Sequence, residues 1–348
     1  MLTDVTLRDF RCFEALKFSP GSGRTFVMGA NAQGKTSILE AICLLLRLQS
    51  PRTGNTGEAI KFEQSRFSLD AHFAGAHMVF HYSREGKEIL LDSKPQGRTD
   101  DYLDMARVAW FSNTDLELVR GGGSVRRRYL DFLGIQCVPG YRKSLRSYEK
   151  ALRSRNALLK DNRPRREIQA FDLPLVEAGE FLFAARAGLC GALAPLARAA
   201  CLDISGGADE MEISYEAGGE RPFAEALAAS LNDEMRLRQT IVGPHRDDLR
   251  ILLNRLEASS FASEGQQRGI ALSLKLAQAR HLEVVQNRAP ILLLDDVFGE
   301  LDPVRRNRLL ISLPVQSQTI ITTTFLDWAE HKPDDQVFHL AAGRLERV

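Results

Sequence analysis

The sequence predicts an α/β fold in which both ends of the chain build one lobe and a mostly helical lobe is inserted between them. A short apolar strand at 24–28 leads through a glycine-containing loop into an apolar helix at 37–48. A second apolar strand, at 291–294, ends in two carboxylates. Between these strands, the stretch 115–239 is rich in Leu, Ala and Arg and has few strand patterns. We therefore expect an α/β lobe formed by residues 1–114 and 240–348, with 115–239 as the helical insert.

Apolar periodicity defines the elements expected in the α/β lobe. The stretches 67–73 and 78–82 alternate apolar and polar residues like an antiparallel pair of strands. The continuous apolar run 291–294 is instead typical of a parallel strand that is buried on both faces. The other expected elements are strands at 4–10, 88–91, 107–111, 249–253 and 319–323 and helices at 266–283 and 304–313.

Length and composition narrow the class of protein. The chain has 348 residues, which is room for about two domains, and its 44% hydrophobic and 26% charged residues exclude collagen-like and low-complexity chains. The longest apolar stretch, 181–200, carries Arg186, Pro195 and Arg198, so we expect no membrane span. The opening residues lack the pattern of a secretory signal, and five cysteines without a C-x-x-C spacing favour reduced thiols. These features predict a cytoplasmic protein.

The net charge is distributed unevenly along the chain. Residues 120–166 contain 14 Lys and Arg against 3 Asp and Glu, a net charge of +11 over 47 residues. Because the whole chain carries +1, the remainder carries −10. A basic segment within an acidic remainder indicates a polyanionic partner.

Residues 29–36 match the phosphate-loop pattern G-x-x-x-x-G-K-[ST] in full. In this pattern backbone N–H groups surround a polyphosphate, the lysine contacts its β- and γ-phosphates, and the Thr hydroxyl binds magnesium. The expected strand and helix flank the loop, whereas a glycine-rich turn that only caps the helix is the alternative. The candidate ATP-binding residues are Gly29, Ala30, Asn31, Ala32, Gln33, Gly34, Lys35, Thr36 and Ser37, of which Lys35 is also a candidate catalytic residue and Thr36 a candidate Mg²⁺ ligand.

Asp295 and Asp296 follow the apolar run 291–294. The carboxyl end of a parallel strand is where α/β sheets bind ligands. We expect Asp295 to hold Mg²⁺ and Asp296 to orient or deprotonate the attacking water as a candidate catalytic base. An acidic turn after a core strand is the alternative.

Ser263-Glu264-Gly265-Gln266-Gln267-Arg268 precedes a long amphipathic helix. Ser263 and Gln266 have the spacing of a capping box, and helix capping alone could explain why they stand at a helix start. A helix N-terminus with a serine hydroxyl also favours an anion. The segment alone does not distinguish these two readings.

The order of the motifs resembles that of the ABC-type ATPases: a phosphate loop, a long insert, S-x-G-Q at a helix start, and an apolar strand ending in carboxylates. The resemblance implies an ATP-dependent homodimer in which this signature segment binds the γ-phosphate of ATP held by the other copy. It also implies that Leu301 and Asp302, within Gly299-Glu300-Leu301-Asp302, form a D-loop along the dimer interface. The implied signature residues are Ser263, Glu264, Gly265, Gln266 and Gln267.

Within the ABC-type ATPases, the transporter branch carries a histidine that the stretch 319–324 lacks. The long SMC-like members carry heptad repeats that the insert lacks. The chain is most similar to the RecF family of bacterial recombination-repair ATPases. The resemblance covers nearly the whole chain, and its matching segments include 7–11, 37–46, 110–116, 126–131, 243–248 and 263–302.

Resemblance to the RecF family implies a weak, DNA-dependent ATPase that binds double-stranded DNA and single-strand/double-strand junctions as an ATP-bound dimer. It implies action with RecO and RecR in loading RecA, and a part in the SOS response. Two departures stand out. Asn113-Thr114 replaces a usual Pro-Glu in a segment like a Q-loop, which makes Asn113 a candidate sensor of Mg²⁺ or the γ-phosphate. Asp296 replaces the usual Glu, and its shorter side chain predicts slow hydrolysis.

The basic segment supplies the DNA candidates. Arg142, Arg146, Lys150 and Arg153 are spaced four, four and three residues apart, so a helix would place them on one face, suited to phosphates. Only Tyr141 and Tyr148 lie nearby, so backbone recognition of duplex DNA is favoured over base stacking. A solvated or ion-paired helix surface is the alternative. The full set is Arg126, Arg127, Arg128, Arg142, Lys143, Arg146, Lys150 and Arg153.

Two other classes of protein compete with an ATP-gated DNA-binding protein. A transporter ATPase subunit is opposed by the absent histidine and the basic insert, and a phosphate-loop kinase would not need the segment Ser263 to Gln267. The stretch Gly243 to Asp248 has no mechanism that its residues suggest. We expect a rigid turn with an Arg–Asp pair there, and no metal at His245, which lacks a second ligand.

Overall fold

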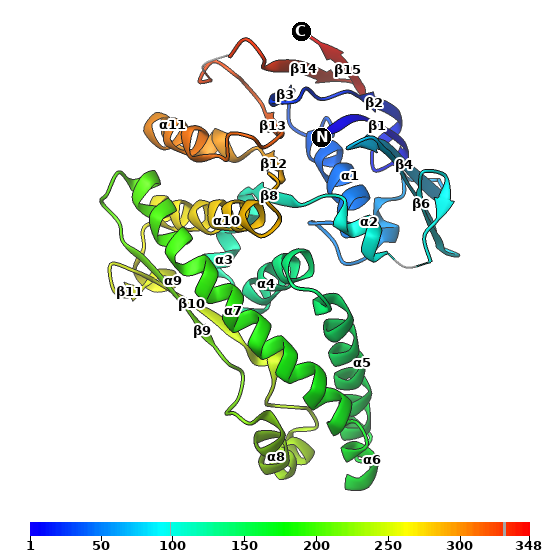
Figure 1. Ribbon diagram of the computed structural model, residues 1–348, viewed down its shortest axis with the longest axis vertical. Coiled ribbons are helices and arrows are strands. Elements are labelled where there is room, and N and C mark those ends of the chain that lie inside the picture. The colour runs from blue at the N-terminus through cyan, green and yellow to red at the C-terminus, as the bar shows by residue number, and fades with distance from the viewer. Residues whose placement is uncertain (98, 330–331) are drawn as a thin grey trace. The chain divides into compact units, whose positions relative to one another are not determined.

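The computed structural model describes residues 1–97, 99–329 and 332–348, and the chain divides into two compact units (Figure 1). Unit 1 comprises Met1–Asp115 and Gln278–Val348, and unit 2 comprises Leu116–Ala277. The insert therefore extends to 277 and does not end at the expected 239. Strand pairing is the reason, because β10 (Asp248–Leu253) pairs with β9 (Met211–Glu216) inside unit 2.

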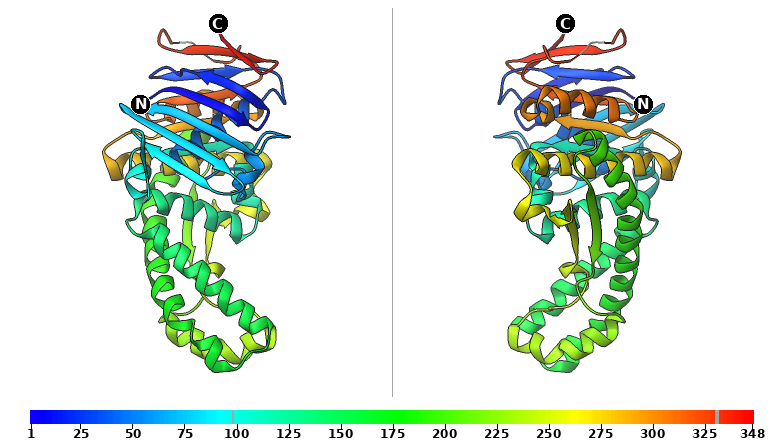
Figure 2. Two further views of the ribbon diagram at one scale, coloured as in Figure 1. Left: turned by 90° about the vertical axis from the view of Figure 1, so that its right-hand side faces the viewer. Right: turned by 90° about the vertical axis from the view of Figure 1, so that its left-hand side faces the viewer.

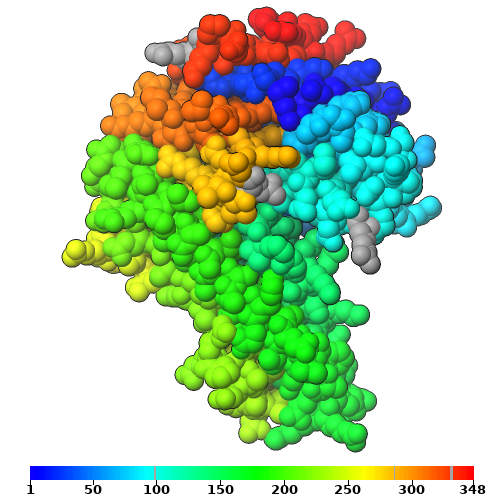
Figure 3. Space-filling model, viewed as in Figure 1, coloured from blue at the N-terminus to red at the C-terminus, as the bar shows by residue number. Residues whose placement is uncertain are grey.

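Unit 1 contains a mostly parallel six-stranded sheet, made of β3 (Arg24–Met28), β8 (Val108–Ser112), β12 (Ile291–Asp295), β13 (Thr319–Thr323), β14 (Gln336–Ala341) and β15 (Arg344–Arg347). The strand order is β15-β14-β3-β13-β12-β8, and β15 is antiparallel to β14. β12 lies between β13 and β8 with all of its apolar residues buried, as the continuous apolar run predicts. Strands from before and after the insert interleave, so both chain ends lie side by side in unit 1 (Figure 3).

An antiparallel sheet forms the second layer of unit 1. Its strands are β1 (Leu2–Phe10), β2 (Phe13–Phe18), β4 (Arg66–Phe73), β5 (Ala76–Ser83), β6 (Lys87–Leu91) and β7 (Lys94–Pro95), in the order β2-β1-β4-β5-β6-β7 (Figure 2). The expected pairing of 67–73 with 78–82 is confirmed, since Phe73 lies opposite Ala76 across a tight turn.

Helix α1 (Lys35–Arg47) fills the space between the two sheets of unit 1. It contacts β8, β12 and β13 on one side and β1 and β4 on the other, and it is buried along nearly its whole length. This burial explains why most of its residues after Ser37 are apolar. The other helical segments of unit 1 are α2 (Asp100–Asp104), α11 (Pro303–Ser312), η1 (Thr56–Ala59), η4 (Val297–Glu300) and, at the boundary with unit 2, η2 (Asn113–Leu116).

Unit 2 is mostly helical, with a three-stranded antiparallel sheet in the order β11-β10-β9. The long helices α5 and α7 run side by side (Figure 2). Helix α10 begins in unit 2 and continues into unit 1. The elements are α3 (Glu117–Arg120), α4 (Gly123–Cys137), α5 (Tyr141–Lys160), α6 (Arg165–Gln169), α7 (Asp172–Ser205), α8 (Phe223–Leu237), η3 (Pro244–Arg246), β11 (Leu256–Glu257), α9 (Ala258–Phe261) and α10 (Glu264–Gln286).

The helical stretch Arg165–Ser205, which includes α7, is long and apolar enough to cross a membrane by length and composition. Its apolar side chains, however, form the core of unit 2: Leu182, Phe183 and Leu193 are fully buried. Its Arg186 is buried too and ion-paired within the unit. These contacts are those of a core helix in a globular unit.

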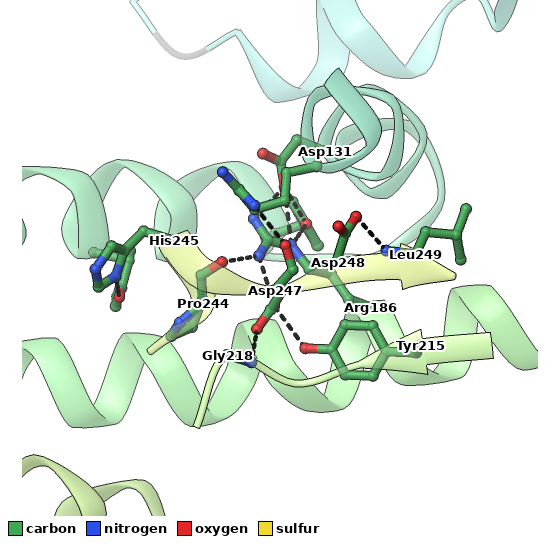
Figure 4. A network of polar contacts seen from close by, with 12 residues as sticks. Asp131, Arg186, Tyr215, Gly218, Pro244, His245, Asp247, Asp248 and Leu249 are labelled. Carbon is green, nitrogen blue, oxygen red and sulfur yellow. Dashed lines mark hydrogen bonds and ion pairs between the residues drawn. The ribbon is translucent and has the colours of Figure 1, made fainter. Parts of the chain in front are cut away.

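Arg186 anchors a buried polar network around the segment Gly243 to Asp248 (Figure 4). Its guanidinium reaches Asp247 Oδ2 at 2.7 Å, Asp131 Oδ1 at 2.8 Å and the carbonyl of Pro244 at 2.6 Å. Asp247 also accepts hydrogen bonds from the Tyr215 hydroxyl and the Gly218 amide. The segment is a turn, as expected, but Asp247 pairs with an arginine on α7 and not with its neighbour Arg246. These contacts hold the turn in place within unit 2.

His245 is held neutral beside this network. Its ring lies between the Tyr148 hydroxyl, 2.7 Å from Nδ1, and the Thr240 carbonyl, 3.0 Å from Nε2, which fits an Nε2–H that donates to the carbonyl. Burial lowers the pKa of His245 to about 4. Among the described residues, no group of three or more His, Cys, Asp and Glu is placed to hold a metal ion.

The buried His245 predicts acid sensitivity of the fold. Between pH 6.5 and about 4 the unfolded chain protonates this residue and the folded chain does not, so stability present above pH 6.5 is lost as the pH falls. We expect the free energy of unfolding to drop by about 3 kcal/mol from this residue over that range. Urea unfolding of the native chain and of His245→Gln at pH 7, 6 and 5 measures it. Equal pH slopes for the two chains would contradict the prediction.

Candidate nucleotide site and signature segment

The phosphate loop connects β3 to α1, as its pattern requires. Gly34 caps α1 in a left-handed conformation, with φ of 103°. A Cβ on Gly34 would lie 2.6 Å from Cys12 Sγ, and one on Gly29 would lie 2.5 Å from the Leu340 carbonyl oxygen. Both positions therefore exclude any larger residue. The loop wraps the N-terminus of α1, where the backbone N–H groups and the helix dipole favour an anion.

Lys35 lies folded over the loop. Its Nζ donates to the carbonyls of Gly29 at 2.7 Å and Ala30 at 3.0 Å. Burial lowers the Lys35 pKa, and the carboxylates of Asp296 and Asp295 oppose that shift. The ammonium is thus a buried cation held by neutral carbonyls, with two anions close by. A nearby phosphate would stabilise this ammonium, because charge-assisted hydrogen bonds would replace its contacts with the carbonyls.

Asp295, at the end of β12, lies beside the phosphate loop. Its Oδ1 accepts hydrogen bonds from the hydroxyls of Thr36, at 2.8 Å, and of Thr322, at 2.9 Å. Burial raises the Asp295 pKa, and the two hydroxyl donors oppose the shift. Thr36 and Asp295 were both expected to be magnesium ligands, and the fold brings their oxygens into contact. A hydroxyl and a carboxylate are the oxygen donors that Mg²⁺ takes from proteins.

Asp296 adopts a left-handed backbone conformation, with φ of 52°. Its Oδ1 is buried and has no hydrogen-bond partner, although a buried polar atom normally has one. Burial raises the pKa of Asp296, as the neighbouring Asp295 also does, and Lys35 opposes the shift. The amide of Asn113 donates to the Asp296 carbonyl and to Glu300 Oε1, each at 3.4 Å. Asn113 therefore lies next to the acidic strand end.

An open pocket of about 510 Å³ extends from the phosphate loop, with Lys35, Thr36 and Asp296 in its wall. Its lining also contains two arginines, Arg11 and Arg52, that share one buried carboxylate. Glu40 Oε1 lies 2.6 Å from Arg11, and Glu40 Oε2 lies 3.0 Å from Arg52. No motif marks Glu40 or Arg52, so neither residue is recognisable as part of a site from the sequence. Glu40 is missed because it lies inside a helix that otherwise reads as apolar.

The remaining residues of the phosphate loop differ in whether they line the pocket. Gln33 Oε1 accepts from the backbone of Ala342 in the β14–β15 turn, which directs its side chain away from the pocket. Ser37 is buried on α1 beside Cys12. Asn31, Ala32 and Ser37 line the pocket. All five cysteines are free.

The signature segment opens α10 in unit 2. Ser263 and Gln266 form the capping box, with Gln266 Oε1 3.0 Å from the Ser263 amide and Ser263 Oγ 3.3 Å from the Gln266 amide. Ser263 and Glu264 are nevertheless accessible to solvent. The side-chain Nε2 of Gln266 donates to Asp209 Oδ1, at 2.9 Å. The same segment can therefore form the capping box and still present an accessible helix end to an anion. The sequence alone did not decide between these two roles.

Two implied interface residues have partners within the chain. Gln267 is buried, and its amide donates to the Ala262 carbonyl. Asp302 caps α11 by accepting hydrogen bonds from the Val304 and Arg305 amides. Leu301 is buried. Within one copy these side chains shape the segments that carry them.

The DNA candidates divide into two groups. Arg126 is mostly buried and forms a bidentate pair with Asp248, and Arg127 donates to the Asp247 carbonyl, so both are engaged within unit 2. Arg128 is exposed on α4. On α5 the residues Tyr148, Ala151, Arg155 and Leu159 are buried. The opposite face carries Arg142, Lys143, Arg146, Lys150 and Arg153, of which all but the half-buried Arg142 are exposed.

The mostly parallel and the antiparallel sheet of unit 1, the phosphate loop beside an acidic strand end and the signature helix define an ABC-type ATPase. A family model described as "AAA domain" matches residues 4–113. The Smc head bound to the C-winged helix domain of ScpA has the same fold, with a TM-score of 0.56 at 13% identity over 100% of this chain and 96% of that one.

More similar proteins identify the family. A DNA replication and repair protein RecF from Microcystis aeruginosa is 35% identical over 99% of both chains. Two solved structures of the recombination mediator protein RecF align over the whole of this chain and 98% and 97% of theirs, with TM-scores of 0.90 and 0.88 and identities of 29% and 30%. The chain belongs to the RecF family.

Proposed function

We propose that this protein is an ATP-dependent DNA-binding protein of recombinational repair. ATP drives two copies together on double-stranded DNA or at single-strand/double-strand junctions, and slow hydrolysis releases them. The dimer acts with RecO and RecR to help load RecA, in connection with the SOS response, in the cytoplasm. The proposal is supported by the solved relatives, one described with ATP and both assigned to the RecFOR pathway.

The observation that carries the proposal is the contact of the Thr36 hydroxyl and the Asp295 carboxylate at the mouth of the phosphate loop. These donors fit Mg²⁺, and the loop that excludes side chains at Gly29 and Gly34 fits a polyphosphate. Bound Mg²⁺ would neutralise charge on the phosphates. Thr36 and Asp295 would hold the cation, Lys35 would bind the terminal phosphates, and Asn113 would report their presence to Asp296 and Glu300.

Asp296 is the proposed base that orients water for hydrolysis. Its unpartnered, buried Oδ1 and raised pKa suit a group that takes a proton. The side chain is one methylene shorter than Glu, which limits its reach.

Asp296→Glu is therefore expected to raise kcat for ATP hydrolysis about tenfold, which corresponds to about 1.4 kcal/mol of barrier. Phosphate release under saturating ATP, with and without duplex DNA, measures the change. Asp296→Asn serves as the control, because it keeps the shorter length and removes the base. If Asp296→Glu hydrolyses ATP no faster than the native protein, the length of the Asp296 side chain does not limit hydrolysis.

The basic face of α5 is the proposed DNA contact. Changing Arg142, Arg146, Lys150 and Arg153 together to Ala should weaken duplex binding and reduce the slope of log K against log salt by roughly 3 to 4, because each phosphate contact releases about one counterion. Arg236→Ala, a change at an exposed arginine on α8, is the matched control. Binding measured from 50 to 300 mM salt tests the prediction, and an unchanged slope refutes it.

One experiment separates the proposed function from its competitors. The protein is mixed with ATP, ADP or no nucleotide, and its mass in solution and its retention of DNA are recorded together. Dimers that form with ATP alone and retain DNA support the proposal. A monomer that phosphorylates a small acceptor would instead identify a phosphate-loop kinase, and ATP turnover without DNA retention would favour a transporter subunit.

A further inference from the structure

Arg120, the last residue of α3, is attached to the signature segment. Its Nε donates a hydrogen bond to Gln267 Oε1 at 2.5 Å, and its Nη2 lies 3.8 Å from Glu264 Oε2. The side chain is still 41% exposed, so the guanidinium stays at the surface of unit 2. Arg120 and Gln267 are 147 residues apart in the sequence, and no motif connects them.

Gln267 explains how a surface arginine can be held in place. Its side chain is 7% exposed, and its amide is engaged at both ends: Oε1 accepts from Arg120, and Nε2 donates to the Ala262 carbonyl at 2.9 Å. Gln267 therefore orients Arg120 and fixes the residue that precedes Ser263.

The charges around the start of α10 show what Arg120 contributes. Glu264 is an exposed anion at the N-terminus of the helix, where it repels an incoming phosphate. Arg268 lies 2.8 Å from Glu264, and the two arginines together hold the Glu264 pKa below its usual range. Glu264, Arg268 and Arg120 together carry +1. Without Arg120 this group would carry no net charge.

We propose that Arg120 offsets the charge of Glu264, so that the signature segment attracts the terminal phosphate of a nucleoside triphosphate held by a second copy of the chain. Arg120 is a positioning and charge-compensating residue, and Ser263 with the helix N-terminus contacts the phosphate. The inference rests on the proposed function, because it requires that second copy.

The test uses the full chain without DNA. Arg120→Ala is expected to raise the protein concentration needed for half-maximal dimerisation in ATP about tenfold. The double variant Arg120→Ala with Glu264→Gln restores the net charge of +1 and is expected to recover most of that loss. Arg236→Ala, at an exposed ion pair on α8, should dimerise like the native chain. Mass in solution against protein concentration is the readout.

Binding of a fluorescent ATP analogue to dilute, monomeric protein is measured in parallel. It should be equal in all variants, because the phosphate loop is untouched, and this equality shows that each variant is folded. The inference is overturned if Arg120→Ala dimerises like the native chain, or if the double variant is no better than the single one. A native chain that does not dimerise in ATP would instead overturn the proposed function.

Discussion

Lys35→Ala is expected to weaken ATP binding at least about 100-fold, a loss of about 2.7 kcal/mol. The Lys35 ammonium is buried in the phosphate loop, where its present partners are two backbone carbonyls. Charge-assisted hydrogen bonds to phosphate are stronger than these contacts, and no other cation of the loop can replace them. Without nucleotide, dimers and DNA retention should disappear together. Titration with a fluorescent ATP analogue measures the affinity directly.

The control for this prediction is Lys17→Ala, which removes an exposed lysine from β2 in the same unit. It should bind the nucleotide as the native chain does. If Lys35→Ala retains near-native affinity, the phosphates are not held by this loop, and the proposed nucleotide site is wrong.

Ser263→Arg is expected to abolish ATP-dependent dimers and duplex capture while leaving nucleotide binding by the monomer intact. Ser263 is exposed at the start of α10, and its hydroxyl belongs to the surface proposed to meet the nucleotide of the second copy. An arginine there fills the space that the phosphate needs. The loss in free energy of dimerisation should exceed the cost of removing a helix cap, which is about 1 kcal/mol. Light scattering and DNA retention at saturating ATP measure the outcome.

Two controls accompany this variant. Ser263→Ala removes only the hydroxyl and should weaken dimerisation partially. Ala229→Arg adds an arginine to an exposed position of α8 in the same unit and should have no effect. If Ser263→Arg still pairs and captures duplex DNA at saturating nucleotide, the nucleotide is not shared between two copies.

Local patterns predicted the elements that hold the nucleotide. β12 is recognisable because four successive apolar residues require burial on both faces, and α1 because a phosphate loop demands a helix after it. The β14–β15 hairpin was missed, although QVFHLA alternates and Gly343 adopts the positive φ of its turn. The boundary at 277 was missed because β10 looks the same in sequence whichever sheet it joins.

Pairing between distant residues could not be predicted from the sequence. Arg126 reads as part of a basic run, and only the fold shows that its partner Asp248 lies 122 residues away. The same holds for Arg186 with Asp247 and for Arg120 with Gln267. Charge runs predict where cations are abundant, and the fold decides which of them remain accessible to a ligand.

The interleaved sheet of unit 1 has a consequence for synthesis on the ribosome. β3 pairs with β13 on one side and β14 on the other. The strand that leads into the phosphate loop therefore has no strand to pair with until the last 30 residues or so of the chain leave the ribosome. Unit 2 is continuous in sequence and is complete long before that point. A nascent or prematurely terminated chain would therefore present the helices proposed to contact DNA without the nucleotide site of unit 1, and such fragments would depend on chaperones and proteases for their removal.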